Sequence, residues 1–343
     1  MTMTSVATTP GVDHVEPEDP IVREAREYAA KLTLLSEGSV NRHFDPFEDI
    51  DWENPDFHPD AVPERWILPV SADPLGRHPW YLSQSKERQI EIGKYRQANV
   101  AKVGLQFESI LISGMVNHTF ALPNGDPEFR YCTHEMTEEL NHTQMFQEMV
   151  NRIGADVPGM GPFVRKLRYL GVPVATLTPN LFFMAVLAGE EPIDHIQKAI
   201  LRSGEEVHPI MRGVMSIHVA EEARHISFAH EFLEHHVPEQ KSFNKFVLSL
   251  AMPLIMWILG RSIATPPKSF FDEFDIPEEV RKELFYGSKE ARKVFADYFV
   301  DVRALAKEIG LMNPVARRMW KMLRIDGPSS RYRSEPLRVA KAS

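Results

Sequence analysis

Two segments of the sequence repeat one pattern of metal-binding side chains. Residues 138–142 and residues 221–225 both read Glu-Glu-x-x-His. Because residues three or four apart share one face of an α-helix, each segment would point a carboxylate and an imidazole in the same direction. Two such helices, with one further Glu from each of two others, form the ligand set of a carboxylate-bridged dimetal site in a four-helix bundle. The spacing therefore predicts a two-metal centre.

The second segment is preceded by a further histidine. His218, Glu222 and His225 are spaced i, i+4 and i+7, so all three would lie on one stripe of a helix. In the first segment, Glu139 and His142 occupy the corresponding positions. Neutral imidazole together with carboxylate suits iron or manganese. An ordinary surface of Glu and His residues is the alternative, and the recurrence of the pattern in two segments argues against it.

The first acid of each segment has a separate predicted role. Glu138 and Glu221 directly precede the expected ligand carboxylates. A metal-bound histidine usually donates its second ring N–H to a carboxylate or a carbonyl, which fixes its tautomer. We therefore expect each of these acids to reach a histidine on the partner helix. The alternative is a solvated surface acid.

A site of this kind needs two further carboxylates. Glu108 lies in the apolar segment VGLQFESILISG, where a carboxylate is costly to bury unless it is paired or metal-bound. Glu190 follows the apolar run NLFFMAVLAG in the same way, and its neighbour Glu191 is the alternative. We choose Glu190 because it directly continues the buried run.

Other candidate ligands fit the pattern less well. Glu135 lies four residues before Glu139 and could join its stripe, although a surface or supporting acid is the simpler interpretation. Cys132 lies on the same face and is expected to be a small buried residue. No Gly-rich phosphate loop follows a strand, so a nicotinamide or flavin cofactor is not supported. The histidines without a partner at metal spacing are interpreted as surface or packing residues: His134, His195, His230, His235 and His236.

The segments that carry the candidate ligands are predicted to be helical. Their apolar periodicity and their Pro and Gly boundaries favour helices, and few runs alternate as strands do. We expect two or three further helices after Pro267 and an irregular segment over residues 43–80. The four long helices are expected at about residues 80–122, 127–153, 174–203 and 207–236.

The sequence as a whole predicts an all-α fold, in which a four-helix-bundle core carries additional helices. We expect one helical domain over residues 21–323, with flexible tails at residues 1–20 and 324–343. The chain has 343 residues, of which 43% are hydrophobic and 25% charged, as is typical of a globular protein. Its net charge of -9 argues against a nucleic-acid ligand.

Cysteine usage and the apolar segments bear on the cellular setting. The single cysteine and an N-terminus without a basic head or an apolar core favour a cytoplasmic protein. Residues 246–260 carry no charge, but this run is shorter than the roughly 20 residues of a membrane span and contains Pro253. We therefore expect a buried core helix and no stable membrane insertion, with a shallow lipid contact as the alternative.

The motifs resemble those of the p-aminobenzoate N-oxygenase family of non-haem diiron oxygenases. That family has a Glu, then an acidic-Glu-x-x-His, then a Glu, then a His-x-x-x-Glu-x-x-His, and the resemblance runs from about His78 to His230. The extra histidine separates the family from ferritins, ribonucleotide reductase small subunits and acyl-carrier desaturases. The resemblance implies a ferritin-like bundle and two iron ions, with manganese as a substitute. The matching positions are Glu108, Glu139, His142, Glu190, His218, Glu222 and His225.

The resemblance also implies an activity. The family oxidises an amine nitrogen with dioxygen to a hydroxylamine, nitroso or nitro product, so we expect a small-molecule (aryl)amine substrate. A separate electron donor of the ferredoxin or reductase type is implied, and a homodimer is left open. The alternative is a hydroxylase or desaturase that acts on carbon of an apolar or acyl substrate. Residues 246–260 favour it, and so do Ala101 and Gly104 before Glu108, where no arginine stands to hold an aromatic carboxylate.

Overall fold

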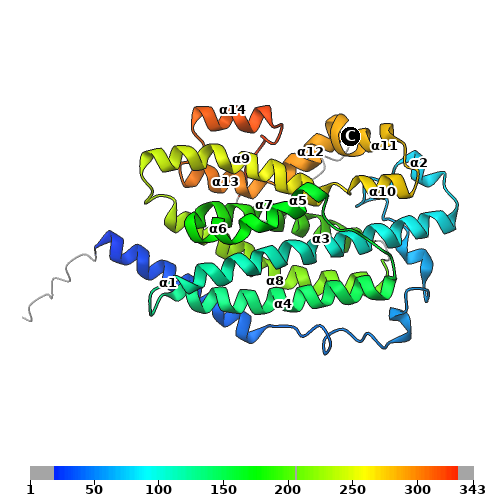
Figure 1. Ribbon diagram of the computed structural model, residues 1–343, viewed down its shortest axis with the longest axis horizontal. Coiled ribbons are helices and arrows are strands. Elements are labelled where there is room, and N and C mark those ends of the chain that lie inside the picture. Colours follow the sequence, from blue (N-terminus) through cyan, green and yellow to red (C-terminus); the bar gives the residue numbers. More distant parts are fainter. Residues whose placement is uncertain (1–18, 205–206, 331–343) are drawn as a thin grey trace, which may run out of the picture.

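The computed structural model describes residues 19–204 and 207–330. In these two ranges the ordered elements are helices and there is no strand. Most of the long helices run roughly parallel to the long axis of the molecule, and shorter helices cover one side and one end (Figure 1). The predicted all-α fold is confirmed.

Four long helices form the core. Helix α3 packs against α4, α7 packs against α8, and contacts between α4 and α8 and between α3 and α7 close the bundle. This is the expected ferritin-like four-helix bundle with additional helices around it. The bundle helices are α3 (Lys86–Phe120), α4 (Pro127–Ile153), α7 (Pro179–Arg202) and α8 (Pro209–His236).

Local sequence signals fix the ends of the helices that carry the candidate ligands. Helix α4 begins where the Asp126 side chain accepts a hydrogen bond from the backbone N–H of Glu128, and it ends at Gly154, whose φ of 72° is left-handed. Helix α8 has Pro209 in its first turn, directly after its capping residue His208. These ends set the rotation at which each helix faces the bundle interior.

The remaining helices surround the bundle. Helix α1 packs on α4 and α8, α6 packs on α3, and α9 packs on α7 and α14. The long outer helices are α1 (Pro20–Asn41) and α9 (Ser242–Ala264). The short α-helices are α2 (Pro79–Leu82), α5 (Pro162–Leu167), α6 (Gly171–Leu177), α10 (Lys268–Glu273), α11 (Glu278–Lys282), α12 (Lys289–Asp297), α13 (Val300–Glu308) and α14 (Pro314–Met322). The single turns are η1 (Pro55–Phe57), η2 (Pro63–Trp66), η3 (Arg168–Leu170) and the π-turn η4 (Glu283–Gly287).

Two details differ from the sequence-based expectation. The helix expected over 80–122 is broken at residues 83–85, and the segment after Pro267 forms five short α-helices instead of two or three. The helix over 174–203 was expected to be kinked or split at its prolines, and it is split before Pro179, whereas Pro192 lies inside α7 without ending it.

The packed structure also extends past residue 324, where we expected a tail to begin. Ile325 is fully buried, and the Arg303 guanidinium donates hydrogen bonds to the carbonyls of Ile325 and Pro328. The expected tails at residues 1–18 and 331–343 lie outside the described residues. The chain from residue 324 to residue 330 is therefore part of the helical domain.

The apolar segment around residues 246–260 forms α9. Within the described residues, one helical stretch, Ser242–Glu273, is long and apolar enough to cross a membrane by length and composition, and core helices of soluble proteins pass the same test. In this fold Leu248, Met252 and Met256 are buried, while Phe243 is exposed. One side of α9 thus packs on the core, and its expected solubility stays a prediction.

Candidate metal centre

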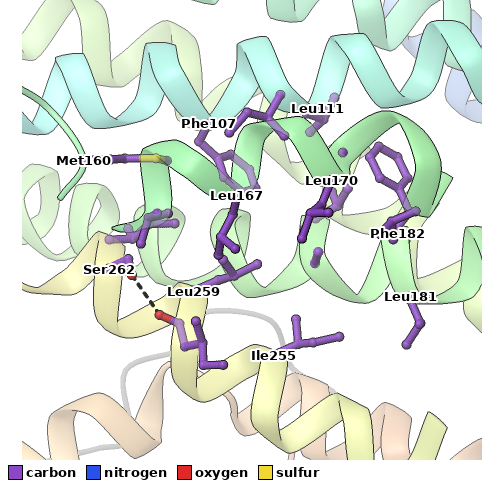
Figure 2. A pocket seen from close by; sticks show the side chains of 18 residues that line it. Phe107, Leu111, Met160, Leu167, Leu170, Leu181, Phe182, Ile255, Leu259 and Ser262 are labelled. Atoms are coloured by element: carbon purple, nitrogen blue, oxygen red, sulfur yellow. Dashed lines mark hydrogen bonds between the residues drawn. The ribbon is translucent and has the colours of Figure 1, made fainter. Parts of the chain in front are cut away.

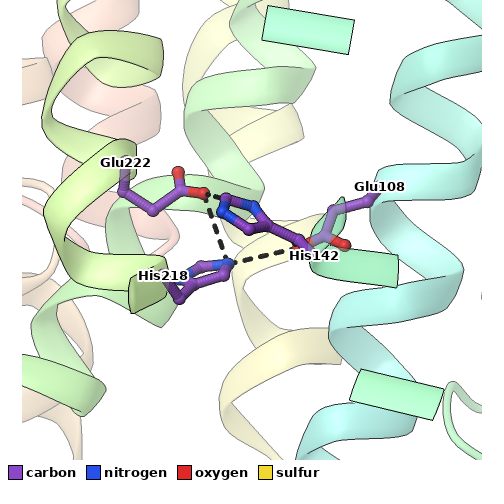
Figure 3. Close-up of side chains that lie close together, drawn as sticks. All are labelled: Glu108, His142, His218 and Glu222. Carbon is purple, nitrogen blue, oxygen red and sulfur yellow. Dashed lines mark hydrogen bonds and ion pairs between the residues drawn. The ribbon is translucent and has the colours of Figure 1, made fainter. Parts of the chain in front are cut away.

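The bundle brings all seven predicted ligand residues into its interior. None of the seven is more than 1% exposed. Figure 3 shows His218 and Glu222 on one helix facing His142 and Glu108 from two others. The seven are Glu108 on α3, Glu139 and His142 on α4, Glu190 on α7, and His218, Glu222 and His225 on α8.

Two histidines are held from behind by acids of the opposite helix. The Nε2 atom of His142 lies 2.8 Å from Glu221, and the Nε2 atom of His225 lies 2.7 Å from Glu138. The two contacts are reciprocal: an acid of α8 holds the histidine of α4, and an acid of α4 holds the histidine of α8. With Nε2–H donated outward, the Nδ1 lone pair of each ring is directed into the cluster. These are the cross-helix contacts expected for Glu138 and Glu221.

One arginine joins the two outer acids. The Nη2 atom of Arg224 lies 2.8 Å from Glu138 and 3.5 Å from Glu221, and it also donates to the backbone carbonyl of Arg42. A buried carboxylate keeps its charge more easily beside a guanidinium. Arg224 therefore favours the ionised form of Glu138 and holds both acids in place, and it was not among the predicted site residues. Its position three residues after Glu221 was the available signal.

Glu222 lies at the centre of the cluster. Its Oε1 atom is 3.3 Å from His218 Nε2, 3.4 Å from His225 Nδ1 and 3.7 Å from His142 Nδ1. Burial raises the pKa of this carboxyl, but the neighbouring histidines outweigh burial and hold the pKa well below its usual range. Glu222 is part of both four-residue groups that could hold a metal ion here, which suits a bridging carboxylate.

Glu139 is the second carboxylate between the two helices. Its Oε1 atom lies 2.9 Å from His225 Nδ1, and its Oε2 atom lies 3.4 Å from His142 Nδ1. Burial raises the pKa of Glu139, but His225 and His142 together lower it by a larger amount, so the net pKa shift is downward. One oxygen toward each histidine is the arrangement that a bridge between two metals needs.

His218 has a different environment from the other two histidines. Its Nε2 atom lies 3.2 Å from Glu108 Oε1, and its ring centroid is 5.0 Å from that of Phe146. Burial lowers the pKa of His218 to about 4, so the ring is neutral near neutral pH. A neutral imidazole has a free lone pair for a metal.

Burial favours the neutral form of the two remaining carboxyls. Burial, reinforced by Glu139, raises the pKa of Glu108 well above its usual range, and burial with Glu222 does the same for Glu190. Glu191, the alternative, points elsewhere: its Oε1 atom lies 3.1 Å from His230. Glu190 is thus the carboxyl that interacts with the cluster.

The donor set fits a pair of metal ions. Each of the seven residues has at least one fully buried oxygen or nitrogen that makes no hydrogen bond. A buried polar atom without a partner costs free energy, and such clusters persist where the atoms serve another purpose. Cations would satisfy these atoms and displace the protons of Glu108 and Glu190, so metal binding would release protons.

The chain matches the family P-aminobenzoate N-oxygenase AurF over residues 25–310. It belongs to this family. The match covers the whole bundle, α9 and the short helices up to α13. The AurF family is a family of diiron oxygenases of ferritin-like fold, whose activity class is oxidoreductase and whose reactants are dioxygen and small molecules.

Close relatives occur in mycobacteria. An uncharacterized protein of Mycobacterium bovis (strain ATCC BAA-935 / AF2122/97) is 61% identical over 320 residues, which cover 92% of this chain and 93% of the relative. An uncharacterized protein of Mycobacterium tuberculosis (strain ATCC 25618 / H37Rv) matches with the same identity and coverage.

Glu135 and Cys132, which the sequence left as less favoured candidate ligands, are both buried near the AurF-type ligand set. Glu135 is fully buried one turn before Glu139, both its carboxyl oxygens lack a hydrogen bond, and burial raises its pKa to about 8. Its part in the centre stays open. Burial raises the pKa of the Cys132 thiol, which disfavours the thiolate that a metal would need.

One further group of ligand-type side chains and one arginine were not predicted from the sequence. Glu191, His195 and Asp301 form a further group of ligand-type side chains behind α7. Arg96, three turns before Glu108, lines a small cavity with Gly104. No arginine was expected on the side of α3 that precedes Glu108. Arg96 is paired with Asp73 at 2.6 Å. These contacts join segments that are far apart in sequence, so no local spacing of residues predicts them.

Proposed function

We propose that this chain is a diiron oxygenase that inserts oxygen into the nitrogen of a primary amine, and that it works in the cytoplasm. The observation that carries the proposal is the set of seven buried, inward-facing ligand atoms that includes the third histidine, His218. This set is what the resemblance to the N-oxygenating family rests on. Membership of the family supports the same activity class.

The proposed step is balanced in atoms and electrons when an external donor supplies two electrons. One atom of dioxygen forms the new N–O bond of a hydroxylamine, and the other leaves as water with two protons and two electrons. We propose that the electrons come from a separate protein of the ferredoxin or reductase type. Two iron ions would bind and reduce dioxygen, which no protein side chain can do alone.

The residues of this chain would position the irons and the histidines that bind them. Glu139 and Glu222 would span the two irons and fix their separation, which in two-metal sites is about 3.5 to 4 Å. Glu138, Glu221 and Arg224 hold the imidazoles of His142 and His225 so that Nδ1 points inward. The buried walls exclude water, which would otherwise compete with the amine.

Oxidation of carbon is the second candidate. The specific observation in its favour is an apolar cavity beside Phe107, the residue before Glu108. Such a wall would hold an acyl or alkyl chain as readily as an amine. A hydroxylase or a desaturase that used this centre would need the same two external electrons, so the atom that is oxidised distinguishes the two candidates.

The test is product analysis with labelled dioxygen. Chemically reduced, iron-loaded protein is mixed with oxygen-18 gas and a panel of arylamines, alkylamines and fatty-acyl substrates, and products are identified by mass. Label on nitrogen supports N-oxygenation. Label on carbon alone, with every amine inert, overturns it and promotes the second candidate. The Glu222→Ala variant controls for iron released into solution.

A further inference from the structure

A large apolar cavity lies against the outer side of the α3–α7 face. Its volume is about 270 Å³, and α3, α5, α6, α7 and α9 supply its walls (Figure 2). A buried cavity of about 150 Å³ lined by aliphatic and aromatic side chains is enough to bind benzene. This cavity therefore has room for a larger hydrocarbon group.

The lining offers no partner to a charged or polar ligand. Among the lining side chains, Ser262 is the single one with a polar atom, and its hydroxyl donates to the Ile258 carbonyl at 2.9 Å. Ligand pockets normally contain a few polar groups that orient the ligand. Here the part of a ligand that occupies the cavity has to be hydrocarbon, and any polar group has to lie at one of its ends.

The inner wall of the cavity is formed by the helix segments that carry Glu108 and Glu190. Phe107 and Val186 line it, and they lie one residue before Glu108 and one helical turn before Glu190. The Phe107 ring packs against Gly189, where a Cβ atom would come within 2.0 Å of the ring. This wall thus belongs to the same two helices, α3 and α7, that carry these two ligand carboxylates.

The outer end opens toward solvent. Leu170 lines the cavity and is 53% exposed, and its neighbour Tyr169 is 70% exposed. Exposed apolar side chains next to an apolar cavity are typical of the entrance for a lipophilic ligand. The cavity therefore has an apolar rim at its outer end and, in its inner wall, residues that neighbour the ligand carboxylates in sequence.

We infer that the cavity binds the unbranched hydrocarbon chain of the substrate, with the reacting group beyond Phe107 at the metal centre. The inference rests on the proposed function and narrows it to alkyl-chain amines. An arylamine with a carboxylate would leave that charge unpaired in this cavity, which is strongly unfavourable.

Binding to the metal-free, full-length protein tests the inference separately from catalysis. The neutral fluorophore N-phenyl-1-naphthylamine is displaced by two series, n-alkylamines and n-alkanols, from six to fourteen carbons. We expect affinity to rise about fourfold per methylene until the cavity is filled, in both series. p-Aminobenzoate should not displace the probe.

Two valines of α6 provide a matched pair of variants. Val174 lines the cavity, whereas Val172 of the same helix does not and is 36% exposed. Val174→Asp should weaken chain binding at least about tenfold, since a buried unpaired charge is costly, while Val172→Asp should bind as the wild type does. Circular dichroism checks that both fold. If Val174→Asp unfolds, Ala185→Phe, which adds bulk to the same cavity, should shorten the best-bound chain.

The outcomes separate this inference from the proposed function. No dependence on chain length, or equal binding by the two aspartate variants, overturns the inference even if arylamines are oxidised. Chain binding by metal-free protein together with oxygen-18 on carbon supports the cavity as the chain-binding site, but it refutes N-oxygenation and the narrowing to alkyl-chain amines. If the iron-loaded enzyme oxidises alkylamines best at the chain length that binds best, both hold.

Discussion

Two clusters of buried acids and histidines lie in the same bundle, and they are satisfied in opposite ways. In the first, which we call the Glu128 cluster, Glu128 accepts hydrogen bonds from Tyr28 at 2.8 Å and contacts His118 at 3.0 Å and His236 at 2.6 Å. None of its fully buried side-chain atoms lacks a hydrogen-bond partner. In the metal centre, all seven predicted ligands have orphaned atoms.

The contrast separates a structural cluster from a functional one. The Glu128 cluster joins α1, α3, α4 and α8 with its own hydrogen bonds, so it needs no further group. The metal centre uses the same residue types on the same helices, yet its internal contacts leave inward-facing lone pairs unused. Residue type and burial alone therefore do not identify a metal site. The distinguishing feature here is a cluster of ligand-type side chains that each have an unsatisfied atom.

The largest expected effect comes from removing the central carboxylate. Glu222→Ala should abolish stable binding of two irons and lower turnover by about a thousandfold, because metal catalysis supplies several kcal/mol of barrier reduction. Iron analysis and product assays measure this. Glu128→Ala is the matched control and should keep its iron. Equal loss of iron in both variants would refute the distinction between the clusters.

His218→Ala should separate metal binding from reactivity. Six ligands remain, so the fold and most of the iron should be kept, whereas turnover should fall by about a hundredfold because one metal loses a donor and shifts. Circular dichroism, iron content and the optical spectrum after exposure to dioxygen are the measurements. An unchanged spectrum with unchanged turnover would show that His218 is not a ligand.

The supporting acids should have a smaller effect. Glu221→Gln keeps the shape of the side chain but weakens the hold on His142, which should reduce metal affinity or activity by about 10- to 100-fold. Glu138→Gln should act alike through His225, because the two contacts are equivalent in geometry. Competition with a chelator measures iron affinity. A variant with wild-type affinity would reduce that acid to a packing role.

The Glu128 cluster should affect stability and its pH dependence, but not iron. Burial raises the pKa of Glu128, yet His118 and His236 outweigh burial and lower the pKa to about 2, below the usual value of 4.5. The ionised carboxylate thus adds stability above about pH 4.5, which is lost as pH falls toward 2.

The size of this contribution follows from the pKa shift. It is about 3 kcal/mol at neutral pH, from about 1.4 kcal/mol per pKa unit. Urea unfolding of wild type and Glu128→Gln at several pH values checks it: the difference in unfolding free energy should shrink below about pH 4.5. A constant difference would contradict the assignment.

The sequence predicted the bundle and the centre because both follow helical periodicity. Glu139 with His142, and His218 with Glu222 and His225, lie within two turns of one helix, so a single stripe identifies each set. Glu190 could be preferred over Glu191 only from the apolar run before it. The direction of each side chain depends on how α7 is rotated in the bundle, and local spacing does not contain that rotation.

Other features depend on contacts between distant segments. Glu128 meets Tyr28 and His236 across 100 and 108 residues of chain, and no short motif links them. The apolar cavity is assembled from five helices in the same way. The short helices after Pro267 were undercounted because helices of five to nine residues carry little periodic signal.

The central claim is that seven residues of the bundle hold two irons. The most direct measurement is the iron content of purified protein after anaerobic loading with ferrous iron and removal of the excess, together with the Mössbauer spectrum of the oxidised sample. The account predicts about two irons per chain and an antiferromagnetically coupled pair, as bridging carboxylates hold the metals about 3.5 to 4 Å apart. A stable content near one iron per chain, or retention of zinc alone, would contradict it.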